Sequence, residues 1–306
     1  PPSAAPGAAP QYVGHLMPAH RGQPGIASAG SGASTGDFTG DGRQDILARH
    51  RDTGQLRVYP HSGTYNGTLT YRPPTTINFN WSDQRWIGRG KVAGNSTGQA
   101  RELSDVISID YAGRMVVHPH SGRFAGTSTL RAPSVVVGTN WFINDLVFVY
   151  DVNADGWDDL LARRAGTGNT YVYLHSGVFN GTATFQAPQL LVSGGASDVD
   201  QNMADVTLDG VPDLVSVNGG VLLVFSFADN RLFSLGYGWD TIDSVTLTDI
   251  DGDGRTDILG RVRANGNLQV YTHSGRWNPD QIGLAYDTYR TPLVVGLQWN
   301  INDVIT

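Results

Sequence analysis

The stretch DIDGDGRTD, from Asp249 to Asp257, decides how this sequence is interpreted. It places carboxylates at its first, third, fifth and ninth positions and glycines between them. So many like charges in nine residues repel one another in water, and a cation among them would relieve that repulsion. The stretch therefore predicts a metal-binding loop.

The same pattern recurs three times, as DFTGDGRQD at 37–45, DVNADGWDD at 151–159 and DVTLDGVPD at 205–213. Each copy has Asp at positions one, five and nine and Gly at six. Two further signatures recur in step, namely HSG at 61, 120, 175 and 273 and a tryptophan at 141, 239 and 299. The ninth-position residues Asp45, Asp105, Asp159, Asp213 and Asp257 then mark five units of about 50 residues.

Each unit reads as short strands joined by turns. In the first unit, DILARH is followed by the turn DTGQ, by LRVYPHSG and, after a loop, by TTINFNW. Alternating apolar residues and β-branched or aromatic side chains favour strands. We therefore predict an all-β chain, a five-bladed β-propeller of four-stranded blades. Residues 34–306 would form this single domain, preceded by an N-terminal tail or arm at 1–33.

The two ends of the domain predict how the ring closes. The tail INDVIT at 301–306 resembles INDLVFVYD at 143–151, which leads into an acidic loop. We expect this C-terminal strand to complete the first blade, which would hide two sheet edges. The alternative is that GIASAGSGAS, at 25–34, supplies that strand.

Oxygen ligands at this spacing suit Ca²⁺, which takes six to eight of them, whereas zinc prefers His and Cys. We predict about four structural Ca²⁺ ions, which would take the formal charge of −7 to about +1. The alternative is a metal-free Asp/Gly turn. The second unit has Lys91 where the first Asp should stand, so we expect no ion there. Side chains at positions one, three, five and nine and the carbonyl at seven are the predicted ligands: Asp37, Thr39, Asp41, Arg43, Asp45, Asp151, Asn153, Asp155, Trp157, Asp159, Asp205, Thr207, Asp209, Val211, Asp213, Asp249, Asp251, Asp253, Arg255 and Asp257.

These four loops resemble the FG-GAP/VCBS repeat family, which includes the calcium-bearing blades of integrin α-subunit propellers and many secreted bacterial proteins. The resemblance implies a β-propeller with structural Ca²⁺. Integrin-like propellers have seven blades, whereas five units are counted here. The family hosts many functions, so the resemblance leaves the activity open.

The composition excludes or disfavours several kinds of site and partner. The 306 residues contain no cysteine, which excludes disulfides and thiolate metal sites. A net charge of −7 without a basic block disfavours a nucleic-acid partner. The sequence contains no run of 18 apolar residues, so we expect no membrane span. The Pro/Ala-rich opening PPSAAPGAAP indicates a mature secreted chain, and we expect a monomer.

Catalytic motifs are lacking, since the chain has no G-x-S-x-G elbow, H-E-x-x-H pair or phosphate-cradling loop. Glu102 is the only glutamate. The aspartates outside the acidic loops include Asp83, Asp145, Asp243 and Asp303, which recur at similar positions and so indicate architecture, and Asp110. An extracellular lyase or hydrolase is therefore the least favoured function.

The HSG segments supply the candidate ligand sites. Each carries a histidine and, four residues later, an aromatic residue, while an arginine recurs on a preceding strand. Aromatic faces stack on sugars, and His, Asn and Arg bond hydroxyl groups. We predict repeated carbohydrate sites and hence a lectin that binds a cell-surface or extracellular glycan. The alternatives are a protein-interaction or targeting platform, and a purely structural role for the histidine. The candidate residues are His61, Tyr65, His120, Phe124, His175, Phe179, His273, Trp277, Arg49, Arg163 and Arg261.

Overall fold

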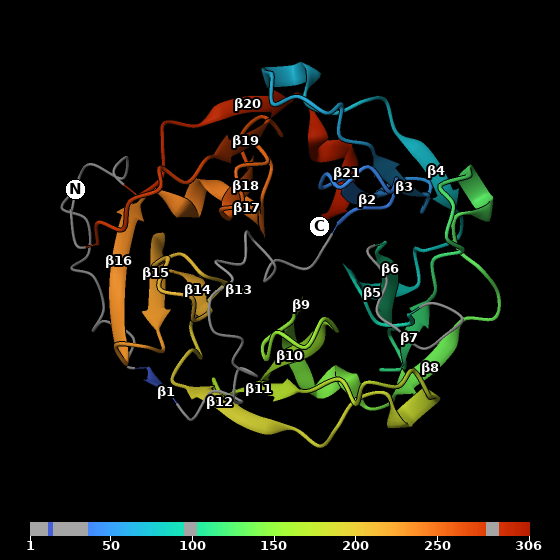
Figure 1. Ribbon diagram of the computed structural model, residues 1–306, viewed down its shortest axis with the longest axis horizontal. Helices are drawn as coiled ribbons and strands as arrows, with labels where there is room; N and C mark the ends of the chain where they lie inside the picture. Colours follow the sequence, from blue (N-terminus) through green and yellow to red (C-terminus); the bar gives the residue numbers. More distant parts are fainter. Residues whose placement is uncertain (1–11, 15–35, 95–102, 280–287) are drawn as a thin grey trace.

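The computed structural model describes residues 12–14, 36–94, 103–279 and 288–306. These residues form five antiparallel sheets arranged around a central axis, with six single-turn 3-10 helices between strands (Figure 1). The predicted five-bladed β-propeller of four-stranded blades is confirmed. No helix in the described parts of the chain is long and apolar enough to span a membrane.

Within each blade, the four strands are named below in order from the innermost, at the central axis, to the outermost. Blade 1 contains β21 (Asn302–Ile305), β2 (Ile46–His50), β3 (Leu56–Tyr59) and β4 (Thr75–Asn78). Blade 2 contains β5 (Gln84–Gly90), β6 (Asp105–Asp110), β7 (Met115–His118) and β8 (Val135–Gly138). Blade 3 contains β9 (Asn144–Tyr150), β10 (Asp159–Arg164), β11 (Thr170–Tyr173) and β12 (Gln189–Ser193). Blade 4 contains β13 (Asp200–Ala204), β14 (Asp213–Asn218), β15 (Val221–Ser226) and β16 (Arg231–Tyr237). Blade 5 contains β17 (Ile242–Thr248), β18 (Asp257–Val262), β19 (Leu268–Tyr271) and β20 (Leu293–Gly296).

The C-terminal strand closes the ring, as predicted. β21 pairs with β2 through Ala48 opposite Ile305, and Leu47 and Thr306 exchange two backbone hydrogen bonds of 2.8 and 2.9 Å. β21 therefore holds the innermost position of blade 1, beside the label C in Figure 1. The alternative segment, 25–34, lies outside the described residues.

The core is divided into five apolar clusters, one at each seam between adjacent blades. The second strand of each blade is covered on both faces by its neighbours, which explains its continuous buried runs. In β18, for example, every residue from Asp257 to Arg261 is buried. Such strands carry apolar residues on both faces rather than in strict alternation.

A short segment of the N-terminal arm joins this framework. β1 (Val13–Gly14) pairs antiparallel with β12 and adds a fifth strand to the outer edge of blade 3 (Figure 1). The rest of the predicted tail, residues 1–11 and 15–33, lies outside the described residues.

Candidate functional site

The acidic loops lie between the first and second strands of their blades. In blade 5, the Asp249 carboxylate accepts hydrogen bonds from the backbone N–H groups of Gly252, Asp253 and Gly254. Asp253 in turn accepts one from the N–H of Arg255, at 3.0 Å. The same bonds recur in the other three loops, where Asp41, Asp155 and Asp209 each accept from the seventh residue. These bonds fold each loop around its carboxylates.

The glycine at position six is required by the backbone. Gly42, Gly156, Gly210 and Gly254 have φ between +78° and +91°. Side chains rarely tolerate this left-handed conformation, so glycine makes the sharp turn possible.

In blades 1, 2, 3 and 5, the ninth aspartate joins the loop to the residues that follow the third strand. Asp257 accepts the N–H groups of Ile250 and Asp251 with one carboxylate oxygen and that of His273 with the other. Asp45 makes the equivalent three bonds in blade 1. All five ninth-position aspartates are at most 2 % exposed. The ninth aspartate is therefore a structural link as well as a predicted ligand.

The second unit separates these two roles. Lys91 stands at its first loop position, yet Asp105 still accepts the N–H groups of Val92, Ala93 and His120. The backbone N–H of Lys91 donates to Asp158, in the loop of blade 3, at 2.6 Å. The link made by the ninth aspartate thus persists where the other acidic residues are missing.

The donor atoms of two loops suit a hard cation. In blade 5, one ligand atom from each of Asp249, Asp251 and Asp257 lies within 4.8 Å of the other two. In blade 4, Thr207 Oγ1 and Asp213 Oδ1 are buried without a hydrogen-bond partner among the described residues. A buried oxygen without a partner is costly, and a bound cation would satisfy it. Ca²⁺ therefore fits the residues present.

Burial acts strongly on these carboxyl groups. It raises the pKa of Asp45 to about 6, of Asp257 to about 7, and of Asp159 and Asp213 to about 8. Backbone N–H donors oppose this rise, and neighbouring aspartates add to it. The electrostatic environment of the loops thus disfavours several bare negative charges and would favour a compensating positive one.

The predicted histidines lie inside the propeller. All four are at most 1 % exposed. In each, Nδ1 accepts the N–H of the glycine two residues later, at 2.9–3.0 Å. In three of them, Nε2 bonds a carbonyl oxygen of the preceding blade's loop, namely Phe38, Val92 or Val206. His120, His175 and His273 therefore tie blade to blade, and the burial of all four, His61 included, favours the structural role that was the alternative for these histidines.

The predicted arginines are also buried between blades. Arg49 pairs with Asp303 and donates to the carbonyl oxygens of Trp81 and Gln84 in the next unit. Arg163 and Arg261 repeat this arrangement with Asp145 and Asp243. Their exposed fractions are between 5 and 8 %, so these three act as structural ties between blades. The expectation that the recurring aspartates are architectural is met by Asp145, Asp243 and Asp303.

The predicted aromatic residues lie at the rim. Each is half-buried and packs on the cluster at the seam with the preceding blade, while the loop around it remains largely exposed. Trp277 also meets Phe233 of blade 4 edge to face, with ring centroids 5.2 Å apart. The four are Tyr65, Phe124, Phe179 and Trp277.

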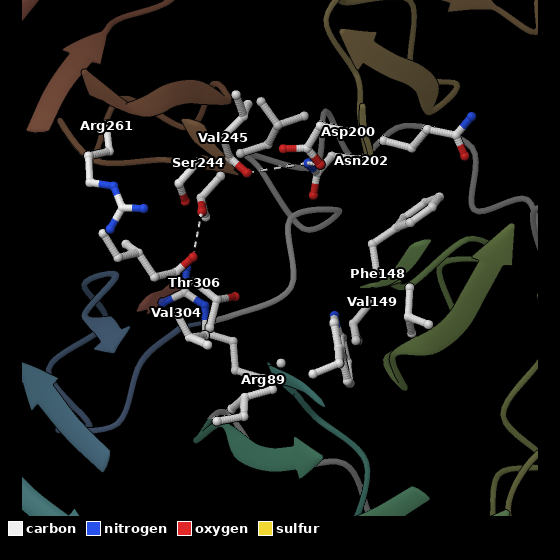
Figure 2. A pocket seen from close by; sticks show the side chains of 18 of the residues that line it. Arg89, Phe148, Val149, Asp200, Asn202, Ser244, Val245, Arg261, Val304 and Thr306 are labelled. Carbon is white, nitrogen blue, oxygen red and sulfur yellow. Dashed lines mark hydrogen bonds between the residues drawn. The ribbon is translucent and has the colours of Figure 1, made fainter. Parts of the chain in front are cut away.

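A cavity of about 300 Å³ lies on the propeller axis, lined by the innermost strands of all five blades. Figure 2 shows Asp200 and Asn202 of blade 4 facing Thr306 and Arg89 across it. Asn202 donates to the Asp200 carboxylate at 3.3 Å, and burial raises the pKa of Asp200 to about 7. Sequence reasoning missed these residues because only the closed ring brings them together.

Comparison with known protein families supports the interpretation of the acidic loops as repeats of one family. Residues 151–216, which contain the loops of blades 3 and 4, match the FG-GAP-like repeat. The family resemblance seen in the sequence is confirmed over these residues. Among solved structures, an Agrocybe aegerita lectin, described as recognising non-reducing terminal N-acetylglucosamine, is 15 % identical and covers 86 % of this chain and 79 % of its own, with a TM-score of 0.41. BBS1N, solved in complex with ARL6DN, is 9 % identical and covers 85 % and 83 %, with a TM-score of 0.34. No curated protein matches the sequence.

Proposed function

We propose that this protein is a secreted, monomeric β-propeller binding module, stabilised by calcium, which holds carbohydrate at repeated sites on its rim. The supporting observation is the repetition of one rim loop in four blades. Each copy presents a half-buried aromatic ring beside exposed polar residues. An aromatic face flanked by hydrogen-bonding groups is the common chemistry of sugar recognition.

Hydrogen bonds within the rim loops support their conformation. In blade 1, the N–H of Asn66 donates to Thr70 Oγ1 at 3.0 Å, and Ser62 Oγ donates to the carbonyl oxygen of Thr64 at 3.1 Å. The same bonds recur around Asn180 in blade 3. A preorganised loop pays less entropy on binding, and several weak sites on one rigid rim gain avidity.

Calcium would act on the framework rather than on the ligand. Ions in the four acidic loops would be bound by the aspartates at positions one, five and nine, the oxygen-bearing residue at three and the carbonyl at seven. Binding to the folded state alone adds to its stability by mass action.

A glycan array, measured with and without EDTA alongside thermal melts of the same samples, tests the proposal. Binding to defined sugars that persists in EDTA until the protein melts supports a lectin with structural calcium. Replacing Asn66 and Asn180 by alanine should then weaken array binding at least tenfold. Blade 2 already has Ala125 at this position and serves as an internal reference. An array without binding, together with a calcium-dependent melt, would reject the lectin and retain the fold.

A second candidate, a protein-interaction platform, is favoured by a different surface. Exposed apolar side chains recur where the outer strand of one blade turns towards the next inner strand. They are between 49 and 71 % exposed: Phe79, Phe142, Val199, Tyr237 and Leu297. A protein partner that spans neighbouring blades would bury these side chains. Replacing Phe79 and Phe142 by serine should then abolish partner binding and leave sugar binding unchanged.

A further inference from the structure

The seam between blades 3 and 4 differs from the other four. At each of those, a tryptophan at the end of one unit packs on an aromatic ring of the next. The ring centroids lie 4.1–5.0 Å apart in these pairs: Trp299 with Tyr59, Trp81 with His118, Trp141 with Tyr173 and Trp239 with Tyr271. These contacts close the seams with large apolar surfaces.

At the fifth seam, Gly195 stands in the place of the tryptophan. Its N–H donates to the carbonyl oxygen of Gly168 at 3.1 Å, just as that of Trp141 donates to Gly113 at 3.0 Å. Its carbonyl oxygen accepts from Arg163, as that of Trp81 accepts from Arg49. The backbone is therefore equivalent, but the aromatic side chain is missing.

Tyr12 of the N-terminal arm takes that place. Its ring stacks on Phe225 of blade 4, with centroids 5.9 Å apart and an interplanar angle of 27°. Its Cε1 atom lies 3.5 Å from where a side chain on Gly195 would begin. A residue from the start of the chain thus fills the slot that a local tryptophan fills elsewhere.

The slot is polar at its far end and matches a phenol. The Tyr12 hydroxyl lies 2.7 and 2.6 Å from the two oxygens of Asp198 and 2.9 Å from Ser216 Oγ. Gln201 and Asn218 each donate to Asp198, at 2.7 and 2.8 Å, and fix that carboxylate. A buried carboxylate held in this way selects a hydroxyl-bearing ring.

The slot also recognises the two residues that follow. Val13 pairs with Ser193 and Gly14 with Val192 along the edge of β12. A Cβ atom on Gly14 would lie 2.7 Å from the ring of Phe225, so the site has no room for a side chain there. Strand addition at an open edge with one side-chain pocket is a common mode of peptide recognition.

We propose that the seam between blades 3 and 4 is a docking site for an extended Tyr-x-Gly segment, and that Tyr12–Gly14 of the same chain is its resident ligand. The arm binds there as a tethered peptide. Its local concentration at the slot is high, so the site is closed to a free peptide as long as Tyr12 is in place.

A labelled peptide of residues 8–18, AAPQYVGHLMP, tests this on the full chain. The variant Tyr12→Ala should bind the peptide at least tenfold more tightly than the wild type, in which the slot is filled. The same peptide with its tyrosine replaced by alanine should not bind. Equal binding to the wild type and Tyr12→Ala, or none to either, would overturn the proposal.

A milder variant tests the docking of Tyr12 in case Tyr12→Ala does not fold. Tyr12→Phe keeps the ring and removes the hydroxyl bonds, so amide hydrogen exchange over 189–193 should quicken at least threefold relative to the wild type. Exchange over 135–138, the corresponding outer strand of blade 2, is the control and should not change. Equal exchange at 189–193 in both proteins would contradict docking, and a dimer that the Tyr12→Ala change dissolves would show that the arm occupies a second copy instead.

Discussion

Blades 5 and 4 carry the same acidic loop but are joined to the ring differently. In blade 5, Asp257 uses both carboxylate oxygens, Arg261 reaches blade 1, and His273 reaches the loop of blade 4. In blade 4, Asp213 uses only one oxygen. Val217 and Phe227 stand where blade 5 has the arginine and the histidine. Blade 4 thus retains the loop but lacks two of the ties.

The comparison separates what a metal would do from what the framework already does. Blade 5 is fastened by direct bonds to both neighbours. Blade 4 relies on the histidine of blade 5, on the ring of Tyr12 and, on our proposal, on a cation for its unsatisfied loop oxygens. We therefore expect blade 4 to respond most to loss of metal and blade 5 most to loss of side-chain ties.

Removing calcium should have the largest effect. Several ions bound to the native state alone would each add a few kcal/mol, about 2.7 kcal/mol at one hundred times the dissociation constant. We expect EDTA to lower Tm by at least about 10 °C. In amide hydrogen-exchange measurements, EDTA should quicken exchange in the loop of blade 4, residues 205–213, before it does so in the loop of blade 5, residues 249–257. A melt that EDTA leaves unchanged would contradict the calcium proposal.

Loss of the ninth aspartate should come next. Asp257→Ala leaves three N–H donors unpaired, two of them buried, and should cost about 3–4 kcal/mol of unfolding free energy, measured by urea denaturation in EDTA. Asp213→Ala removes only two such bonds, and we expect it to cost about 1 kcal/mol less. Equal costs would remove the distinction between the two blades.

Cutting the arginine tie of blade 5 should have a smaller effect. Arg261→Met loses the ion pair with Asp243 and the bonds to the carbonyl oxygens of Trp299 and Asn302. It should lower the unfolding free energy by about 2–3 kcal/mol, because the partner carbonyls are buried. Arg276→Met, at an exposed position of the same blade, is the matched control and should change it by less than about 0.5 kcal/mol.

The smallest effect should be the part of the pH dependence that comes from Asp200 of blade 4. Burial raises the pKa of Asp200 to about 7, whereas an unfolded aspartate titrates near 3.9. Between these values the native state binds more protons than the unfolded state, so stability falls as pH rises from about 4 to about 7 and then levels off.

Asp200→Asn should remove about 1–2 kcal/mol of that decline, less than the full pKa difference implies, because the carboxyl group is only half-buried and solvent screens it. The difference between wild-type and variant denaturation curves, recorded from pH 4 to pH 8, isolates this group from the other aspartates. Ser244 of blade 5 holds the equivalent register and has no proton to exchange in this range, so Ser244→Ala should give parallel curves. Parallel curves for Asp200→Asn as well would contradict the assignment.

The sequence was sufficient for the blade count, the strands and the closing strand, because the acidic loops and turns recur in order along the chain. It was insufficient for the HSG segments. A repeated histidine beside an aromatic residue has the same pattern whether it faces solvent or a neighbouring blade. Only the fold shows that His175 meets the carbonyl oxygen of Val92, 83 residues earlier. The pairing of Arg49 with Asp303 and the position of Tyr12 depend on the closed ring in the same way.

The position of β21 has a consequence for biosynthesis. The strands β2, β3 and β4 are translated before blades 2 to 5, whereas their inner partner β21 is translated after these blades. Blade 1 therefore stays one strand short while blades 2 to 5 are being translated, and the nascent chain exposes the inner edge of β2 throughout. Open edges recruit foreign strands. We therefore expect the unfinished chain to pair readily with strands of other chains until β21 has paired with β2.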